Sequence, residues 1–379
     1  MNAPRPRVAI IAPGFHANAA DPFVPYWRDH IAGLAAYVEA TVFPLRLPAT
    51  SRPYRLFGAD IVPLARGDVR LRHSPALWRD AVAAVVSRHR QAPFDLVHAL
   101  QAGEAGLVGA LAAAAIRRPL LAHIAGGELV RLPALGYGAN TAFERIASAV
   151  ALRCARVVTV GSEAMLALAR RRLAGRAQSA RLAPLGIRVE RFRGLREHRP
   201  GETPLDVLCV ANLNPVKDHA TLIEALAGLP PHLDRTRLSL VGFGSEAGRL
   251  RQLARRHGVA GRVRWWGAVP HAAIHVAYAR ADVYCSSSRH EAQGIALLEA
   301  AAAGLPIAAT PVGVAGDLAA RSLHLAPVGC PAALANAMAV AAEHAPDDCA
   351  ALADAVAADY GLAACTRRFL VAYAAASAR

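Results

Sequence analysis

Lysine is almost absent from this sequence, although basic residues are abundant. Of 43 lysines and arginines in 379 residues, only Lys217 is a lysine. Lysine presents a compact point charge that the broad, planar guanidinium of arginine cannot reproduce at a tight site. A single lysine in an arginine-rich chain is therefore a candidate binding residue.

Long apolar runs are also missing. The longest, Ala105 to Ile116, has twelve residues and ends at two arginines, whereas a membrane-spanning helix needs about 20. Near the N-terminus the apolar run Val8–Ala12 is too short for the core of a signal peptide, so we interpret it as a buried strand. We expect a cytoplasmic protein that can associate peripherally with the inner face of the membrane.

Cysteine is scarce and scattered. The six cysteines form no C-x-x-C pair, which argues against a zinc site and fits free thiols in a reducing compartment. We expect no metal site and no cofactor.

The positive charge is concentrated in the first half of the chain. Residues 1–190 contain 24 arginines against 12 acidic residues, and residues 191–379 contain 19 basic against 16 acidic residues. This excess favours an anionic partner such as a membrane surface, an acidic glycan or a phosphorylated lipid. A solvated arginine-rich surface explains the same numbers. We expect no nucleic-acid partner.

Short apolar runs alternate with helical patterns along the chain, which predicts parallel sheets covered by helices. The pattern occurs twice, on either side of the polar stretch Arg193–Pro204, which we interpret as a linker. We predict an α/β protein with two doubly wound domains, over 1–192 and 204–346, that face a central cleft. A helical segment over 347–379 is expected to pack back toward the first domain. Ligands bind such sheets at the carboxyl ends of the strands.

The strongest motif is E-A-Q-G-I-A-L-L-E, from Glu291 to Glu299. It follows a predicted strand and three serines, and it opens a helix. Gly294 lets backbone N–H groups approach a ligand, and a helix N-terminus suits a diphosphate. Two carboxylates eight residues apart can hold different parts of one long ligand. An ordinary helix with an acid near its start has the same pattern.

Lys217 lies in the stretch Asn212–Asp218, between the first strand of the second domain and the helix that begins at His219. A cation at this edge can neutralise a bound diphosphate. The alternative is a surface lysine beside a helix cap.

The glycines of Val241–Gly248 follow another strand with the spacing G-x-G-x-x-x-G. This is a weak dinucleotide motif, because the spacing differs and no acidic residue follows about 20 positions later. We interpret it as a tight turn that lines the cleft near Gly244.

Two stretches of the first domain end at predicted strand edges. Gly14 and His16 follow the first strand, and the stretch His123 to Glu128 follows the fourth. His123 can exchange a proton near neutral pH. A lone histidine at the end of a strand has a structural role as often as a role in a binding or catalytic site.

Together these residues resemble the family 4 retaining glycosyltransferases of the GT-B fold, which has two Rossmann-like domains. The resemblance is strongest over about 205–345 and continues more weakly over 1–190. Its specific part is the E-x7-E pattern, supported by Lys217 and by Thr310-Pro-Val-Gly313.

The resemblance implies roles for individual residues. Glu291 and His123 are the implied catalytic residues, with Glu291 on the donor-sugar hydroxyls and His123 facing the sugar from the other domain. Lys217 binds the donor diphosphate, and Glu299 binds the ribose hydroxyls.

Further residues are implied on the donor and acceptor sides. The backbone N–H groups of Gly294, Ile295 and Ala296 are offered to phosphate. Gly14, His16 and Glu128 are expected on the acceptor side, and Gly244 is expected on the donor side.

The sequence departs from the family pattern at the donor site. Asn212 stands where the family has an arginine, and Arg188 replaces an acidic residue. We hypothesise that Arg188 restores the missing positive charge for the donor. Gln293 stands where a phenylalanine is common.

The implied reaction moves a hexose-type sugar from a nucleoside-diphosphate sugar to a glycan, a lipid-linked or a small-molecule acceptor, without a metal and with retention of anomeric configuration. Two alternatives stay open: a catalytically silent GT-B binding or assembly protein, and a sugar-nucleotide epimerase. A nicotinamide oxidoreductase is disfavoured, since neither half has G-x-G-x-x-G after its first strand.

Overall fold

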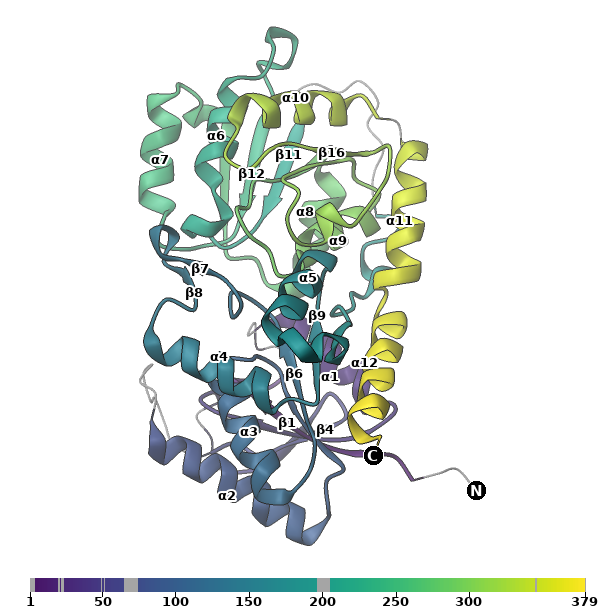
Figure 1. Cartoon of the computed structure of the whole chain (residues 1–379). Coiled ribbons are helices and arrows are strands. Elements are labelled where there is room, and N and C mark those ends of the chain that lie inside the picture. The colour runs from purple at the N-terminus through teal and green to yellow at the C-terminus, as the bar shows by residue number, and fades with distance from the viewer. Residues whose placement is uncertain are drawn as a thin grey trace. The chain divides into compact units, whose positions relative to one another are not determined.

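The chain folds into two compact α/β units (Figure 1). The first comprises Met1–Gly186 and Leu362–Arg379, and the second comprises Ile187–Gly361. The structure, a computed structural model, describes residues 4–19, 21, 24–48, 50, 52–64, 74–195, 205–344 and 346–378.

The first unit is built on a sheet with the strand order β10-β9-β6-β5-β1-β2-β4-β3 among the described residues. Its neighbours pair in parallel except β3 and β4. The strands are β1 (Arg7–Ala12), β2 (Glu39–Pro44), β3 (Tyr54–Leu56), β4 (Ala59–Ile61), β5 (Leu96–Ala99), β6 (Leu120–Ile124), β9 (Val157–Val160) and β10 (Ala180–Leu182). The central strands are nearly continuous apolar runs, because both faces of a parallel sheet are covered.

Helices cover the two faces of this sheet. In β5, His98 contacts Tyr373 of α12, whereas the next residue, Ala99, lies under Gly109 of α3, as expected for side chains that alternate between faces. The helices are α1 (Pro25–Ala35), α2 (Pro75–Gln91), α3 (Glu104–Ile116), α4 (Ala142–Cys154), α5 (Glu163–Leu173) and α12 (Leu362–Ser377).

Short elements connect β6 to α4 and α5 to β10. They are the antiparallel pair β7 (Arg131–Leu132) and β8 (Tyr137–Gly138), with η1 (Pro133–Leu135) between them, and η2 (Ala174–Ser179). Helix α4 begins at a capping box, in which Thr141 Oγ1 accepts from the Glu144 amide and Glu144 accepts from the Thr141 amide.

The second unit contains a fully parallel sheet in the order β13-β12-β11-β14-β15-β16 among the described residues. The strands are β11 (Asp206–Val210), β12 (Arg237–Val241), β13 (Val263–Gly267), β14 (Val283–Ser286), β15 (Ile307–Ala309) and β16 (Leu323–Leu325). The chain runs outward from β11 to β13 and then crosses back to β14. The order therefore reverses between β11 and β14, where doubly wound sheets bind ligands.

Two helical layers enclose this sheet. Val207 and Cys209 of β11 join the core under α6, α7 and α10, whereas Leu208 joins the core under α8, α9 and α11 (Figure 1). The helices are α6 (His219–Ala227), α7 (Ala247–Arg256), α8 (His275–Arg280), α9 (Ile295–Ala302), α10 (Pro331–Ala342) and α11 (Pro346–Tyr360), with the 3-10 helices η3 (Val189–Arg191), η4 (Pro215–Lys217), η5 (Pro231–Leu233), η6 (Ala260–Arg262), η7 (His271–Ala273) and η8 (Gly313–Gly316).

The expected α/β class with two doubly wound sheets is confirmed, but the chain divides at other residues than the sequence suggested. Ile187 and Phe192 pack in the core of the second unit, so this unit begins before residue 192. The C-terminal helical segment is divided between the units, because α11 belongs to the second and α12 to the first. Most of the expected linker 193–204 lies outside the described residues.

No helix among the described residues is long and apolar enough to cross a membrane.

Candidate active site

The loops that follow β11 and β14 meet at the point where the strand order reverses. Lys217 ends η4 after β11, and Glu291 lies in the loop after β14. The Lys217 ammonium donates to Glu291 Oε1 at 2.5 Å, and the Ser288 hydroxyl donates to the same oxygen at 2.8 Å. Both charged side chains are partly exposed, at 23% and 18%, so they remain accessible to a ligand.

Hydrogen bonds hold these two loops together. The Ser287 hydroxyl contacts the carbonyl oxygens of Lys217 and Asp218 at 3.1 and 2.9 Å, and the Arg289 amide donates to Val216 O at 2.8 Å. The Arg289 guanidinium also pairs with the buried Asp218 carboxylate at 2.8 Å. The position of Lys217 is therefore fixed by the backbone on both sides of it.

A third loop, after β15, supports the segment around Glu291. The Thr310 hydroxyl donates to Ser288 O at 2.6 Å, and the Val314 amide donates to Gln293 O at 2.7 Å. Gly313 has φ +58° and lies so close that a Cβ would stand 2.3 Å from Gln293 O. Only glycine allows this approach.

Gly294 is the N-cap residue of α9, and its φ of 101° is in the left-handed region. The first amides of a helix have no partner within it, so Ile295 and Ala296 present N–H groups at the positive end of the helix. Glu291, Gly294 and the start of α9 thus lie together beside Lys217, as the sequence motif implies.

Glu299 lies further along α9 and is almost entirely buried, with 5% exposed. Its carboxylate contacts His271 Nε2 at 2.8 Å and accepts from the Tyr278 hydroxyl at 2.8 Å. Burial and the nearby carboxylate raise the pKa of Tyr278 well above its usual value. The phenol therefore stays protonated and acts as a donor.

Arg191 determines the tautomer of His271. The Arg191 guanidinium contacts His271 Nδ1 at 3.0 Å and donates to His271 O at 2.8 Å. A guanidinium only donates, so Nδ1 is the acceptor and Nε2 carries the proton that is given to Glu299. The carboxylate thus ends a hydrogen-bonded chain that begins at a cation.

The loop after β12 packs on the loop after β11. A Cβ at Gly244 would stand 2.3 Å from Leu213 O, and a Cβ at Gly242 would stand 2.0 Å from Ala211 O. The two glycines therefore allow the backbones of the two loops to approach closely, which agrees with the tight turn predicted from the sequence. Asn212, between the two contacted carbonyls, is exposed.

In the first unit, the residues after β1 are more enclosed than expected for an acceptor loop. Gly14 is buried, and only 1% of His16 is exposed. His16 Nδ1 contacts Asp21 O at 2.9 Å, and the Tyr54 hydroxyl donates to His16 O at 2.5 Å. Burial lowers the pKa of His16. Its expected place on the acceptor side stays a prediction.

His123 lies within β6 and is buried, with 1% exposed. Its Nδ1 contacts Thr159 Oγ1 at 3.0 Å, and its ring packs near Trp27 and Phe369. Burial lowers the pKa of His123 to about 3, so the imidazole is neutral at ordinary pH. It can give or accept a hydrogen bond, and its catalytic role stays a prediction.

Glu128 follows β6 and is held by the backbone beside it. Its carboxylate accepts from the amides of Ala125 at 3.1 Å and Gly126 at 2.7 Å. Burial raises the pKa of this carboxyl, although these hydrogen bonds oppose the shift. Glu128 also lines a pocket of the first unit.

Sequence reasoning did not find three residues of the Glu299 network: Arg191, His271 and Tyr278. They lie in η3, η7 and α8, outside the E-x7-E motif, and no spacing motif joins them. Arg188 precedes η3, and its compensating role stays a hypothesis.

The two α/β units with doubly wound sheets are an architecture of the GT-B kind. Residues 192–352 match the family described as glycosyl transferases group 1. This segment of the chain is therefore similar to that family, in agreement with the resemblance inferred from the motifs.

Curated relatives match a limited part of the chain. A GDP-mannose-dependent alpha-(1-6)-phosphatidylinositol monomannoside mannosyltransferase of Mycobacterium tuberculosis is 35% identical over 150 residues, which are 36% of this chain and 39% of that protein. A phosphatidyl-myo-inositol mannosyltransferase of Mycobacterium leprae is 39% identical over 133 residues, 33% of each chain. The chain thus matches less than half of the length of these relatives.

Solved structures resemble the chain over nearly its whole length. HepE of Anabaena in complex with UDP and glucose has a TM-score of 0.74 at 20% identity, covering 97% of this chain and 99% of HepE. Sucrose-phosphate synthase of Thermosynechococcus elongatus has a TM-score of 0.79 at 22% identity, covering 98% of each. At these identities the likeness establishes the fold, which is GT-B.

Proposed function

We propose that this protein is a retaining glycosyltransferase of family 4 that moves a sugar from a nucleoside-diphosphate sugar to an acceptor without a metal. The observation that carries the proposal is the Lys217–Glu291 pair, placed where the strand order reverses and beside the start of α9. The match of residues 192–352 to glycosyl transferases group 1 supports it.

The geometry suits a diphosphate bound between Lys217 and α9. The Lys217 ammonium has three donor hydrogens, of which Glu291 takes one. Others are available to phosphate oxygens, and the amides of Ile295 and Ala296 add donors at a positive helix end. These donors stabilise the negative charge that grows on the diphosphate as the bond to the sugar breaks.

Glu291 is suited to the sugar rather than to the phosphate. A carboxylate only accepts hydrogen bonds, and Ser288 with Lys217 holds one of its oxygens. The remaining acceptor positions fit sugar hydroxyls close to the anomeric carbon. Glu299, fixed by His271 and Tyr278, fits the ribose hydroxyls in the same way.

Retention follows if the acceptor attacks on the face that the diphosphate leaves. The acceptor oxygen forms the bond to the anomeric carbon, the diphosphate departs with the electron pair, and a phosphate oxygen takes the acceptor proton. No protein nucleophile is required. We propose that the acceptor is a glycan, a lipid-linked molecule or a small molecule. The basic first half of the chain suits contact with an anionic membrane surface.

Product analysis with nucleotide sugars tests this proposal. Purified protein is incubated with UDP-glucose and with GDP-mannose, each with and without a polyol or glycolipid acceptor. A transferase forms a glycosylated acceptor and releases the nucleoside diphosphate. An epimerase converts the donor without an acceptor, and a silent relative binds the donor and leaves it intact. Either of the last two results rejects the proposal.

A further inference from the structure

The first unit contains a pocket of about 900 Å³ that is lined by none of the donor residues discussed above. It is bounded by α4, by the end of α5 with η2, and by the segment after β6. Its volume is within the range of small-molecule sites.

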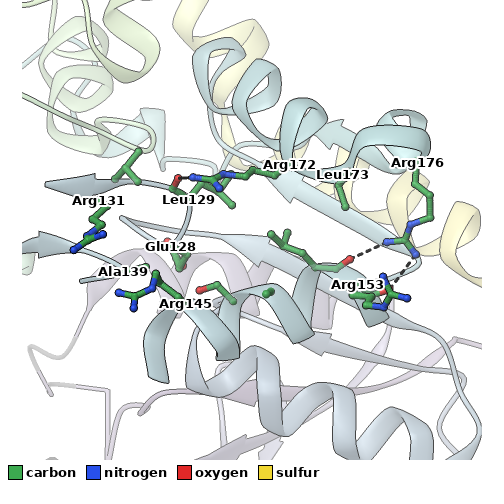
Figure 2. Close-up of a pocket in the computed structure, with 13 residues that line it drawn as sticks. Glu128, Leu129, Arg131, Ala139, Arg145, Arg153, Arg172, Leu173 and Arg176 are labelled. Atoms are coloured by element: carbon green, nitrogen blue, oxygen red, sulfur yellow. Dashed lines mark hydrogen bonds between the residues drawn. The ribbon is translucent and has the colours of Figure 1, made fainter. Parts of the chain in front are cut away.

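Five arginines line this pocket, with one carboxylate, Glu128. Figure 2 shows Arg131 and Arg145 at one end and Arg153 and Arg176 at the other. The fifth is Arg172. Such an excess of guanidinium groups creates a strongly positive concave surface.

None of the five arginines pairs with a carboxylate in the part of the chain that the structure describes. Three of them donate to backbone carbonyls. Arg145 donates to Asn140 O at 2.7 Å, and Arg172 donates to Leu129 O at 3.4 Å. Arg176 makes three such bonds at the end of α4, to the oxygens of Leu152, Arg153 and Ala155 at 2.8, 3.1 and 3.2 Å. A guanidinium has five donor hydrogens, so Arg145 and Arg172 keep most of theirs, whereas Arg176 keeps fewer than half. The guanidinium groups other than that of Arg176 are therefore the ones available to an anion.

Ser148 of α4 also lines the pocket and is 5% exposed. Its hydroxyl is buried and has no hydrogen-bond partner among the described residues. An unpaired buried hydroxyl costs free energy, which a ligand hydroxyl would recover. Glu128, with oxygens already oriented by two amides, offers further acceptor positions to ligand hydroxyls.

The remaining wall of the pocket is apolar, formed by Leu129, Leu152 and Leu173. The pocket thus combines guanidinium donors for an anion, the Ser148 hydroxyl and the Glu128 carboxylate for ligand hydroxyls, and an apolar wall for the carbon skeleton of the ligand. Arginine matches phosphate in geometry as well as charge. We propose that this pocket binds a phosphate ester of a polyol, either free or as the head group of a lipid.

Binding of this ligand is separable from donor binding, because the pocket lies in the first unit and uses none of the donor residues. A probe without a nucleoside separates the two. We would titrate the whole protein with inositol 3-phosphate in a calorimeter. A second titration with inorganic phosphate gives the affinity for the anion without a polyol.

The test variant is Arg131→Ala/Arg153→Ala, because both side chains are exposed and neither donates a hydrogen bond within the described residues. The matched control is Arg170→Ala/Arg171→Ala, which removes the same charge from exposed positions of α5 outside the pocket. We expect the wild type and the control to bind inositol 3-phosphate alike, and the test variant at least tenfold more weakly.

Vesicles distinguish the lipid source from the free ester. The same three proteins are sedimented with phosphatidylcholine vesicles that contain or lack phosphatidylinositol. Pocket-dependent binding of the vesicles without binding of the soluble ester identifies a lipid head group, and the reverse identifies a free ester; both support the pocket. If test and control variants lose binding equally, or the wild type binds neither probe, the proposal is overturned.

Ser148→Ala examines the hydroxyl recognition separately. We expect the substitution to weaken the binding of inositol 3-phosphate several-fold and to leave the affinity for inorganic phosphate unchanged, because the bare anion has no polyol hydroxyl. Equal affinity of Ser148→Ala and wild type for inositol 3-phosphate would refute the polyol part. Circular dichroism and urea denaturation of every variant serve as the folding control.

Discussion

At the scale of single residues, the orientation of Glu299 is determined by its partners rather than by its place in a motif. The carboxylate is buried and contacts both His271 and Tyr278. Arg191 fixes the His271 tautomer through Nδ1. A buried carboxylate with fully arranged donors is rigid, which suits recognition of a diol.

Tyr278→Phe tests this network. The substitution removes one donor from a buried carboxylate and changes the volume little, so we expect a loss of about 1–3 kcal/mol in the free energy of unfolding. Urea denaturation measures it. Tyr37→Phe, at a residue that is 51% exposed, is the control and should change little. Equal stability of the two variants would mean that the hydroxyl contributes nothing to Glu299.

The missing arginine at Asn212 raises the question of which cation assists Lys217. Arg289 pairs with Asp218, the residue after Lys217, and is 42% exposed, whereas Arg188 precedes η3. We expect Arg289→Ala to weaken nucleoside-diphosphate binding by about 1–3 kcal/mol, or roughly five- to 150-fold, if its guanidinium contributes a charged hydrogen bond.

Fluorescence or calorimetric titration of the nucleoside diphosphate compares Arg289→Ala with Arg188→Ala. A larger loss in Arg188→Ala supports the compensation that the sequence suggested for Arg188. Unchanged affinity in both variants contradicts both assignments and leaves Lys217 and the α9 amides as the phosphate donors.

At the scale of elements, glycines fix how the loops after β11 and β12 meet. Gly244 has no room for a Cβ against Leu213 O, whereas Gly248, four residues on in α7, has nothing within 4 Å. The same substitution by alanine at these two positions therefore compares a tightly packed glycine with an unhindered one.

We expect Gly244→Ala to lower the free energy of unfolding by about 1–3 kcal/mol, because the backbone must shift. Gly248→Ala should raise it by up to about 1 kcal/mol, since alanine is favoured over glycine in a helix. Thermal or urea denaturation of both variants checks this. Similar effects of the two substitutions would show that the loops are not closely packed.

The sequence predicts elements well where the signal is local. β11 and β14 are short apolar runs followed by polar residues, so the sequence alone predicts that Lys217 and Glu291 follow the ends of strands. The order of the strands is not predictable in this way, because pairing depends on contacts distant in sequence. Short strands such as β3, β7 and β10 have too few residues to show the alternation that identifies a strand in a sequence.

At the scale of the whole molecule, three buried histidines of the first unit make the stability of the fold depend on pH. His30, His98 and His123 lie near Phe369 of α12. Burial lowers the pKa of His30 and of His123 to about 3, and of His98 well below its usual value. The core of this unit therefore requires neutral imidazoles.

We expect stability to be full above about pH 6.5 and to fall as the pH drops from 6.5 toward 3. In that window the unfolded chain binds protons that the folded chain does not, and each such histidine costs about 1.4 kcal/mol per pH unit. Tm measured across this range checks the slope. His30→Leu should flatten it, whereas exposed His232→Leu should not; equal slopes would contradict the assignment to buried histidines.

The central claim is that Lys217 with the start of α9 binds the diphosphate of a nucleotide sugar. The most direct test is a thermal-shift panel of UDP, GDP, ADP and TDP on the wild type and Lys217→Ala. A nucleotide that raises the Tm of the wild type and not of Lys217→Ala identifies the base and supports the site. No shift by any nucleotide at millimolar concentration, or the same shift in both proteins, would contradict the account.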